Sequence, residues 1–272
     1  MKILFNKYEG AGNDFIIVKN SPQLIDHSDK SLIRDLCDRR FGIGADGLML
    51  IEEYDGYDFR MFYYNSDGSV GEMCGNGARC AAHFAMSHMT GFRDLTFMAG
   101  DGPHTARPDG PGRTEISIRD VSEISEAPDG ILVNTGVPHL VVFTRDCGIT
   151  DVVKRGRKLR RSPASAPAGV NVNFATVVNG KLHVRTYERG VEDETLACGT
   201  GITATAIAAA RTGKIVTSPA TAGSGENDCM AEVITRGGIL SVRFRLAGNG
   251  ATGIYLAGPS TFVFSGETEI QS

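Results

Sequence analysis

Residues 73–77 read Met73-Cys74-Gly75-Asn76-Gly77, and a similar stretch, Ala197-Cys198-Gly199-Thr200-Gly201, occurs 124 residues later. A helix is expected to follow the first stretch, over residues 76–89. The first N–H groups of a helix lack intrahelical partners and carry partial positive charge, so they favour a thiolate or a ligand carboxylate. A cysteine at this position is therefore a better base than a cysteine in a free chain.

The likeness between the two cysteine stretches extends over both halves of the chain. At the same 124-residue offset, the matching blocks are 12–18 with 136–142, 45–50 with 169–174, 60–63 with 184–187, and 74–77 with 198–201. A constant offset through four separate blocks is difficult to obtain by chance. The sequence therefore predicts two copies of one domain.

The expected fold class is α+β, with two pseudo-symmetric duplicated domains. The helices predicted after the cysteines, 76–89 and 199–211, are almost apolar on all sides, so each should be buried. We therefore expect a mostly antiparallel sheet curled around a central helix in each domain, with the helix starts facing a cleft between the domains. The expected domains are 1–120 and 121–259, with the boundary near the turn-rich stretch 122–130.

Composition limits the classes of function. The chain has 272 residues, 41% of them hydrophobic, a net charge of −4 and no tryptophan, which argues against disorder and against a nucleic-acid partner. The first seven residues hold only a short apolar run, and no stretch approaches a membrane span. These features predict a cytoplasmic protein with no membrane partner.

The repeated cysteine permits a specific chemistry. Two thiols on opposite sides of a ligand could take a proton from one face of a carbon and return one to the other face, which is what inversion of an amino-acid centre requires. A thiol redox pair and a purely structural Cys-Gly-x-Gly turn remain alternatives. A metal site is not expected, since the cysteines and histidines show no paired-ligand spacing. The unrepeated cysteines are expected in the core: Cys37, Cys80, Cys147 and Cys229.

A basic run at 154–161 has six Lys or Arg residues in eight. It could form an RNA-binding patch, but no aromatic residues are interleaved with it and no nucleic-acid motif accompanies it. A solvated helix face is therefore the favoured interpretation.

Several motifs, in this order along nearly the whole chain, resemble the diaminopimelate epimerase family. They are Gly12-Asn13-Asp14-Phe15, Arg40-Phe41-Gly42-Ile43-Gly44-Ala45-Asp46-Gly47, Tyr64-Asn65-Ser66-Asp67-Gly68, Met73 to Cys80, Gly169 to Phe174, Glu188-Arg189-Gly190 and Thr195 to Gly201. The resemblance implies interconversion of LL- and meso-diaminopimelate, a small diamino dicarboxylate, in lysine and peptidoglycan precursor biosynthesis. It further implies no pyridoxal phosphate or other cofactor, no metal, a homodimer, and a final strand at about 260–272 that packs back on the first domain.

The same resemblance assigns roles to individual residues. Cys74 and Cys198 would be the acid and base pair, with Glu188 binding the reacting ammonium group and His139 supporting the site. The residues implied in substrate binding are Asn13, Asn65, Gly75, Asn76, Asn173, Glu188, Arg189, Gly199 and Thr200. Arg189 is suited to a bidentate clamp on the distal carboxylate.

Two positions depart from the family pattern. Val137 stands where the family usually has asparagine, and Gly47 stands where some members have glutamine. Both changes affect substrate selectivity rather than proton transfer. A proline or hydroxyproline racemase is the alternative within the same two-cysteine chemistry, but that group usually has histidine at Asn76 and needs no arginine for a second carboxylate. Asn76 and Arg189 favour diaminopimelate.

Overall fold

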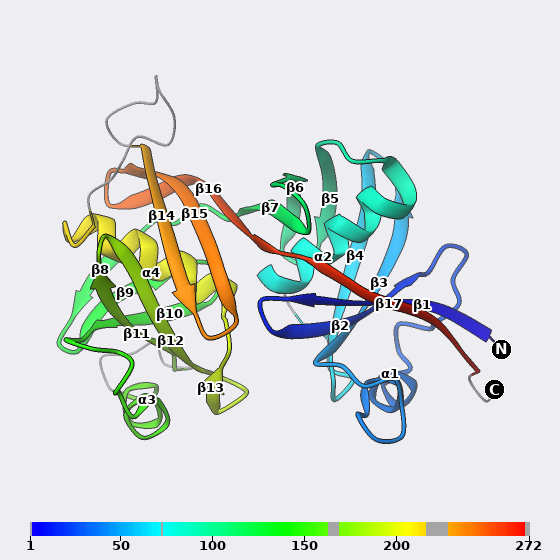
Figure 1. Ribbon diagram of the computed structural model, residues 1–272, viewed down its shortest axis with the longest axis horizontal. Helices are drawn as coiled ribbons and strands as arrows, with labels where there is room; N and C mark the ends of the chain where they lie inside the picture. Colours follow the sequence, from blue (N-terminus) through cyan, green and yellow to red (C-terminus); the bar gives the residue numbers. More distant parts are fainter. Residues whose placement is uncertain (1, 72, 163–168, 216–227, 270–272) are drawn as a thin grey trace. The chain divides into compact units, whose positions relative to one another are not determined.

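The computed structural model describes residues 2–71, 73–162, 169–215 and 228–269 (Figure 1). The chain forms two compact units, one of Met1–Ile116 with Gly258–Ser272 and the other of Ser117–Ala257. Over these described residues, each unit combines a sheet with two α-helices, and one of these helices is buried. None of the described helices has the length and apolarity needed to cross a lipid bilayer.

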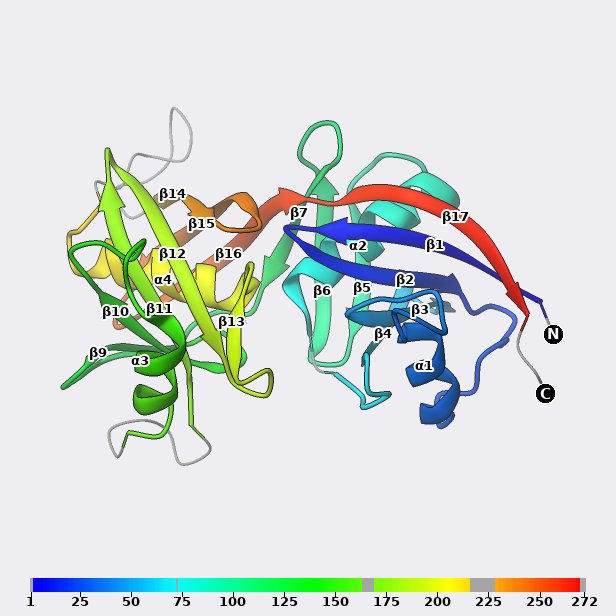
Figure 2. The same ribbon diagram turned by 60° about the horizontal axis from the view of Figure 1, so that its bottom comes forward.

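The first unit is built on a mixed, mainly antiparallel sheet. In spatial order its strands are β17 (Thr261–Glu269), β1 (Lys2–Gly10), β2 (Asn13–Lys19), β3 (Gly47–Tyr54), β4 (Tyr57–Asn65), β5 (Leu95–Ala99), β6 (Gly102–Pro108) and β7 (Arg113–Ile118). The pairs β2–β3 and β4–β5 are parallel. The last strand, β17, pairs antiparallel with β1 along nearly its whole length (Figure 2). The last three residues of the expected 260–272 strand lie outside the described residues.

The second unit repeats this pairing pattern. Its strands are, in order, β8 (Ile124–Ala127), β9 (Gly130–Asn134), β10 (Pro138–Phe143), β11 (Asn171–Val178), β12 (Lys181–Glu188), β14 (Asp228–Thr235), β15 (Gly238–Ala247) and β16 (Gly250–Pro259), with the short β13 (Asp193–Thr195) beside β12. Here the parallel pairs are β10–β11 and β12–β14. β3 and β11 correspond at the 124-residue offset. The predicted α+β duplication is confirmed.

Each sheet packs around one buried helix. In the first unit this is α2 (Gly75–Ala85), which continues as the π-helical turn η1 (Met86–Thr90), and in the second it is α4 (Gly199–Arg211). Nearly every residue of both helices is buried, including polar Asn76 and Arg79. Small residues allow this, because alanine and glycine let a helix lie close to strands on several sides.

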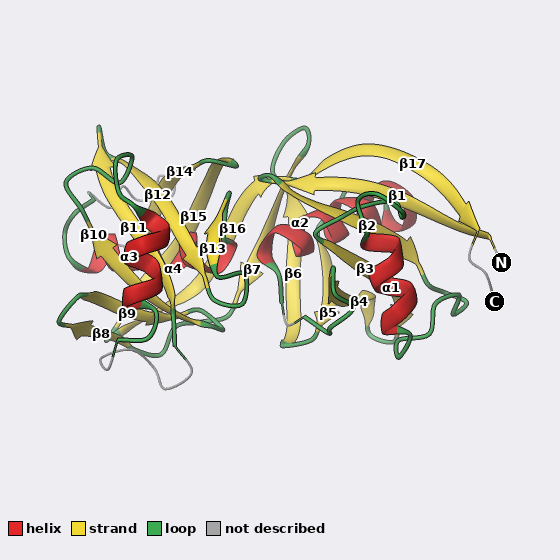
Figure 3. Cartoon of the chain, turned by 90° about the horizontal axis from the view of Figure 1, so that it is seen from below, coloured by secondary structure: helices red, strands yellow, loops and turns green. Residues whose placement is uncertain are grey.

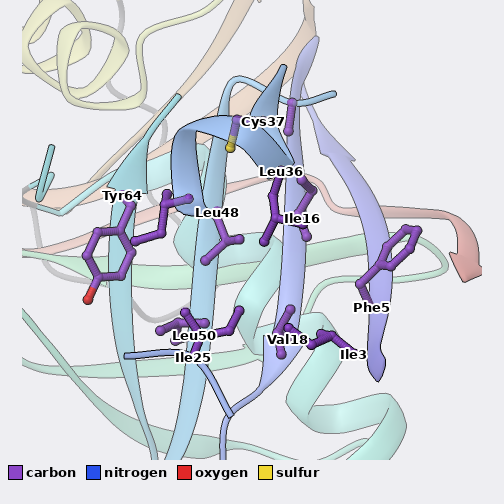
Figure 4. Packing of buried hydrophobic residues seen from close by; sticks show 12 residues of the cluster. Ile3, Phe5, Ile16, Val18, Ile25, Leu36, Cys37, Leu48, Leu50 and Tyr64 are labelled. Carbon is purple, nitrogen blue, oxygen red and sulfur yellow. The ribbon is translucent and has the colours of Figure 1, made fainter. Parts of the chain in front are cut away.

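A second helix covers the other face of the sheet in each unit (Figure 3). In the first unit α1 (Lys30–Cys37) packs over β2 and β3, where its Leu36 and Cys37 meet a cluster of apolar strand residues (Figure 4). In the second, α3 (Val152–Leu159) packs on β11 and β12. The central strands are thus buried on both faces, which explains their continuous apolar runs.

The stretch 122–130 differs from the expectation. The domain boundary is predicted near this stretch, with the second domain from residue 121, and the second compact unit begins at Ser117. Within that unit the stretch forms strand β8 and the turn into β9, which the sequence did not predict. The sequence Pro128-Asp129-Gly130 forms the turn of this hairpin, in which Ala127 pairs with Gly130. A short edge strand with polar residues gives too little apolar alternation to be recognised from sequence.

Candidate functional site

Cys74 and Cys198 occupy equivalent backbone positions in the two units. Each is the N-cap of its central helix, with φ −107° and ψ 111° at Cys74 and φ −112° and ψ 109° at Cys198. Each carbonyl accepts the helix's first backbone hydrogen bond, from Ala78 and Ile202 respectively, both at 2.8 Å. Both thiols are therefore attached beside a helix start, where backbone N–H groups favour a negative charge.

A chain of side-chain amides lies beside Cys74. Asn76 donates from Nδ2 to Oδ1 of Asn13 at 2.6 Å, and Asn13 donates from Nδ2 to Oδ2 of Asp46 at 3.1 Å. Buried Arg79 donates from Nη2 to Oδ1 of Asn76 at 3.0 Å. Two of the predicted binding residues, Asn13 and Asn76, are therefore brought together.

Asn65 is the last residue of β4, and its Nδ2 donates to Oγ of Ser69 at 3.0 Å. Gly47 begins β3, and a Cβ there would lie 2.6 Å from both the Tyr63 ring and the Tyr64 carbonyl. The space that a side chain at Gly47 would need is thus already filled. A glutamine at this position would require Tyr63 to move.

Beside Cys198, the site is formed by threonines. The Sγ of Cys198 lies 3.5 Å from Oγ1 of Thr200, at hydrogen-bond distance for sulfur. Thr135 donates from Oγ1 to the Thr200 carbonyl at 3.0 Å, which anchors the helix start. Thr200 occupies the position of Asn76 in the repeat, so the two cysteines have different polar neighbours.

His139 and Asn173 form a buried polar pair under helix α4. Nδ2 of Asn173 lies 3.1 Å from Nδ1 of His139, and Thr186 donates to Oδ1 of Asn173 at 2.9 Å. Both residues are fully buried, and Gly201 lets the helix approach them, since a Cβ there would lie 2.3 Å from Oδ1 of Asn173. The bond from Asn173 fixes Nδ1 of His139 as the acceptor, so the proton lies on Nε2.

In the first unit, apolar side chains occupy the same places. The equivalent glycine is Gly77, whose added Cβ would meet the methyl of Met49 at 1.8 Å and the ring of Phe15 at 3.5 Å. The geometry of helix against sheet is the same, but Phe15 and Met49 stand where the second unit has His139 and Asn173. The second unit therefore places a polar pair where the fold itself requires only apolar packing.

Burial keeps His139 neutral. Loss of solvation, helped by the positive charge of Arg189, lowers the pKa of His139 from 6.5 to about 3. No described protein atom accepts a hydrogen bond from its Nε2. A buried donor left unpaired is costly, which makes a structural role in packing alone a poor explanation of this residue.

Glu188 and Arg189 follow each other at the end of β12. Burial raises the pKa of the Glu188 carboxyl, although Thr195 opposes the shift by donating from Oγ1 to Oε2 of Glu188 at 2.8 Å. The backbone N–H of Arg189 donates to Asn171 at 2.7 Å, and its Nη1 donates to the Gly169 carbonyl at 3.3 Å. These bonds hold the carboxylate and the guanidinium in fixed directions.

The unrepeated cysteines lie in the core, as predicted. Cys37, Cys80, Cys147 and Cys229 are all buried. Burial raises the pKa of Cys37 to about 12 and also raises the pKa values of Cys80 and Cys147. These thiols stay protonated at neutral pH and are poor nucleophiles or bases.

Most of the basic run lies on α3, with Arg160 and Arg161 just beyond its last residue, and two residues of the run make contacts within the unit. Arg155 lies over the Phe174 ring at 5.0 Å, and Nε of Arg160 lies 2.7 Å from Oε1 of Glu192. Within the described parts of the chain, no cluster of His, Cys, Asp or Glu could hold a metal ion.

Sequence reasoning did not select the residues that bond directly to the predicted site. These are Asp46, Ser69, Arg79, Thr135, Asn171, Thr186 and Thr195. The repeat itself carries a signal for some of them. At the 124-residue offset Arg79 aligns with Thr203, and such a difference between two fully buried, equivalent positions indicates a role beyond packing. The strand pairings place Thr186, opposite Asn173, where the first unit has Tyr63 opposite Met49, so the offset in this strand is 123 rather than 124.

Comparison with known proteins supports one family. The sequence model described as diaminopimelate epimerase matches residues 5–116 and 131–263. The diaminopimelate epimerase of Flavobacterium psychrophilum is 43% identical over 95% of this chain and 97% of its own length, and that of Hydrogenobaculum is 35% identical over 97% and 98%.

Solved structures extend the likeness of fold. A Bacillus anthracis phenazine biosynthesis protein of the PhzF family matches with a TM-score of 0.72 at 14% identity, covering 99% of this chain and 100% of that one. A hydroxyproline epimerase from Agrobacterium vitis matches with a TM-score of 0.66 at 14% identity, over 98% and 92%. These identities are low, so the two structures show a shared fold only. The family match and the curated relatives decide the rest, and this chain belongs to the diaminopimelate epimerase family.

Proposed function

We propose that this protein interconverts LL- and meso-diaminopimelate by a two-base mechanism in which Cys74 and Cys198 are the proton-transferring pair. The observation that carries the mechanism is the equivalent N-cap position of the two cysteines, on the one buried α-helix of each unit. An enzyme that only removes a proton needs a single cysteine, and such an enzyme has no need of a second copy. A pair of cysteines is what inversion of a carbon centre needs.

The chemistry balances within the pair. The thiolate of one cysteine takes the Cα proton, and the electron pair of the Cα–H bond moves into the substrate carboxylate. The thiol of the other cysteine then gives its proton to the opposite face of Cα and becomes the thiolate. Backbone N–H groups of Gly75, Asn76, Gly199 and Thr200 are suited to stabilise the negative charge that builds on the carboxylate.

The remaining predicted residues would recognise the substrate. Glu188 would bind the reacting ammonium group, and Arg189 would bind the distal carboxylate with its guanidinium fork. Asn13, Asn65 and Asn173 would fix the configuration of the distal centre. His139 would donate from Nε2 into the site, which would satisfy its buried N–H.

Diaminopimelate epimerisation belongs to lysine biosynthesis, and we propose that the protein acts in the cytoplasm as a homodimer. All six cysteines are free thiols in the structure, and free thiols are the usual state of cysteine in a reducing compartment. Sedimentation equilibrium of the purified protein tests the dimer, and a monomer at micromolar concentration would contradict it.

The decisive experiment follows inversion and exchange together. Reduced protein is incubated with LL-diaminopimelate in deuterated water, and NMR measures both loss of the Cα proton signal and formation of the meso isomer. Proline and hydroxyproline serve as parallel substrates. Inversion of proline without any diaminopimelate turnover would replace the proposal with a racemase, and turnover of none of them would reject both.

Mutation tests the cysteine pair. Cys74→Ala and Cys198→Ala should each abolish formation of the meso isomer, because either change removes one of the two proton carriers. Cys37→Ala is the matched control, since Cys37 is a buried core thiol. Full activity in either of the first two variants would exclude the two-base mechanism.

A further inference from the structure

Helix α2 carries a cation in a place where its repeat carries none. Arg79 is fully buried, and its side chain donates from Nη1 to the Gly75 carbonyl at 3.1 Å and from Nε to the Pro259 carbonyl at 3.2 Å. Thr203 is the equivalent residue in α4, where its hydroxyl donates to the Gly199 carbonyl at 2.9 Å. The equivalent position in α4 thus needs no charge, and burying a guanidinium in α2 is costly.

The guanidinium fixes the direction of two amides. Arg79 can only donate, so its bond at 3.0 Å requires the oxygen of Asn76 to face it. The NH₂ group of Asn76 must then face Oδ1 of Asn13, and the NH₂ group of Asn13 must face Asp46. One buried cation therefore sets the orientation of two predicted binding residues of the first unit, Asn76 and Asn13.

Asp46, the last member of this series of hydrogen bonds, forms an ion pair with Arg39. Arg39 bridges it to Asp14, with Nη2 at 2.7 Å from Asp46 and 2.6 Å from Asp14. Buried Lys7 lies 2.8 Å from Asp14. Although burial alone would raise the pKa of Asp14, hydrogen bonds from Arg39 and Lys7 hold it well below its usual range, so this end of the chain stays anionic.

The same cation acts on Cys74 electrostatically. Burial lowers the pKa of Arg79 to about 10, so the guanidinium remains charged at neutral pH, and negative charge on Cys80 or Cys74 would oppose that shift. Burial keeps Cys80 in the thiol form. The guanidinium of Arg79 donates to the carbonyl of Gly75, the residue that follows Cys74, so the charge lies beside the start of the helix. The other charged groups that act on Arg79 are Glu9 on β1 and Arg113 on β7, and Asp109 partly neutralises Arg113 at 3.0 Å.

We propose that Arg79 is a positioning residue of the Cys74 half of the site. It orients Asn76 and Asn13, and its charge favours the thiolate of Cys74, so that the resting protein carries the thiolate there and the thiol at Cys198. The catalytic consequence rests on the proposed function, but the charge asymmetry does not.

Thiol alkylation tests the asymmetry without any turnover. The rate of reaction with iodoacetamide is measured against pH, peptide by peptide, for Cys74 in a Cys198→Ala protein and for Cys198 in a Cys74→Ala protein. The alkylation rate of Cys74 should reach half its maximum at a lower pH than the alkylation rate of Cys198. A midpoint for Cys198 at or below that of Cys74 would overturn the proposal, and this comparison needs no change at Arg79.

Variants of Arg79 separate charge from orientation. In the Cys198→Ala background, Arg79→Met should raise the midpoint of Cys74 by about one pH unit, the lower end of the effect of a nearby opposite charge. Arg79→Lys keeps the positive charge, so the midpoint of Cys74 alkylation should stay low. In the protein with both cysteines, Arg79→Lys should raise KM more than it lowers kcat, because lysine lacks the guanidinium group that orients Asn76. Thr203→Val is the matched control and should leave the midpoint of Cys74 unchanged.

The outcomes remain distinguishable. A folded Arg79→Met protein with an unshifted midpoint would show that Arg79 is only structural. A wild-type protein that has the asymmetric midpoints but inverts no diaminopimelate would reject the proposed function and leave the charge asymmetry standing.

Discussion

At the residue scale, two equivalent backbone positions can carry opposite chemistry. Phe15 and His139 lie at matching places in β2 and β10, and both contact the glycine near the start of the central helix. Burial of the apolar Phe15 ring stabilises the fold. Burial of the His139 imidazole costs free energy, and the cost is lower for the neutral form than for the charged form. The cost is measurable as a dependence of stability on pH.

We predict that His139→Phe makes the protein less sensitive to mild acid. The pKa of His139 is about 3 in the folded protein and 6.5 without burial, so below pH 6.5 the unfolded chain binds a proton that the folded chain does not. Stability is therefore lost as the pH falls from about 6.5 towards 3. Between pH 7 and pH 5, wild type should lose about 1–2 kcal/mol more than the variant.

Urea unfolding at a series of pH values measures this difference. His88→Gln, a change of an exposed histidine, is the control and should follow wild type. Parallel curves for wild type and His139→Phe would mean that His139 takes up its proton normally in the folded protein.

Some site residues could be predicted from the sequence and others could not. The cysteines, Glu188 and Arg189 stand in contiguous motifs, which sequence reasoning could select. Arg79 and Asp46 act through hydrogen bonds between strands and a helix far apart in sequence, and only the fold brings such partners together.

At the scale of elements, the two central helices provide a matched pair of sites. Gly77 and Gly201 both allow their helix to lie against the sheet, but they face different neighbours. Met49, opposite Gly77, ends in a flexible methyl group that can move. Asn173, opposite Gly201, is hydrogen-bonded to His139 and Thr186 and cannot move without breaking those bonds.

We predict that Gly201→Ala is damaging and Gly77→Ala is tolerated. The added methyl at Gly201 should cost about 1–3 kcal/mol of stability and lower kcat/KM about 100-fold, because it displaces the buried polar pair. At Gly77 the better helix propensity of alanine, about 1 kcal/mol, should offset the crowding. Thermal unfolding and steady-state kinetics measure both effects. Equal losses in the two variants would contradict a functional role for the polar pair.

Elements with strong patterns were predicted and weakly patterned ones were not. The helix predicted over 76–89 was found as α2 and η1, and the helix predicted over 199–211 was found as α4. The hairpin β8–β9 was missed, since four residues of alternating polar and apolar character do not stand out from a loop. Its identity follows only from its pairing with β10.

At the scale of the whole molecule, the two units share one order of strand pairing, apart from the short β13, but the strands do not follow the same order along the chain. The edge of the second sheet beside β9 is formed by β8, which precedes β9 directly along the chain. The corresponding edge beside β1 is formed by β17, from the opposite end of the chain. Sequence offset reveals repeated blocks, but it cannot reveal a strand that has been supplied from elsewhere.

The closing strand should be essential to the first unit. Besides pairing β17 with β1, this segment places the buried hydroxyl of Ser260 2.8 Å from Oγ1 of Thr114 and gives Arg79 its Pro259 acceptor. We predict that a chain ending at Gly258 loses the cooperative fold of the first unit and keeps that of the second. An unpaired β1 would expose a long row of backbone groups, and Arg79 would lack a partner for a buried donor.

Hydrogen exchange followed by peptide mass spectrometry reads the two units separately. In the truncated chain, peptides covering β1 and β2 should exchange within the dead time, while those covering β11 and β12 should stay as protected as in the full chain. Ser260→Ala in the full chain is the milder control and should cost about 1 kcal/mol, the worth of one hydrogen bond. Protection of β1 in the truncated chain would mean that the first sheet is stable with an open edge, and that β17 serves another purpose than completing it.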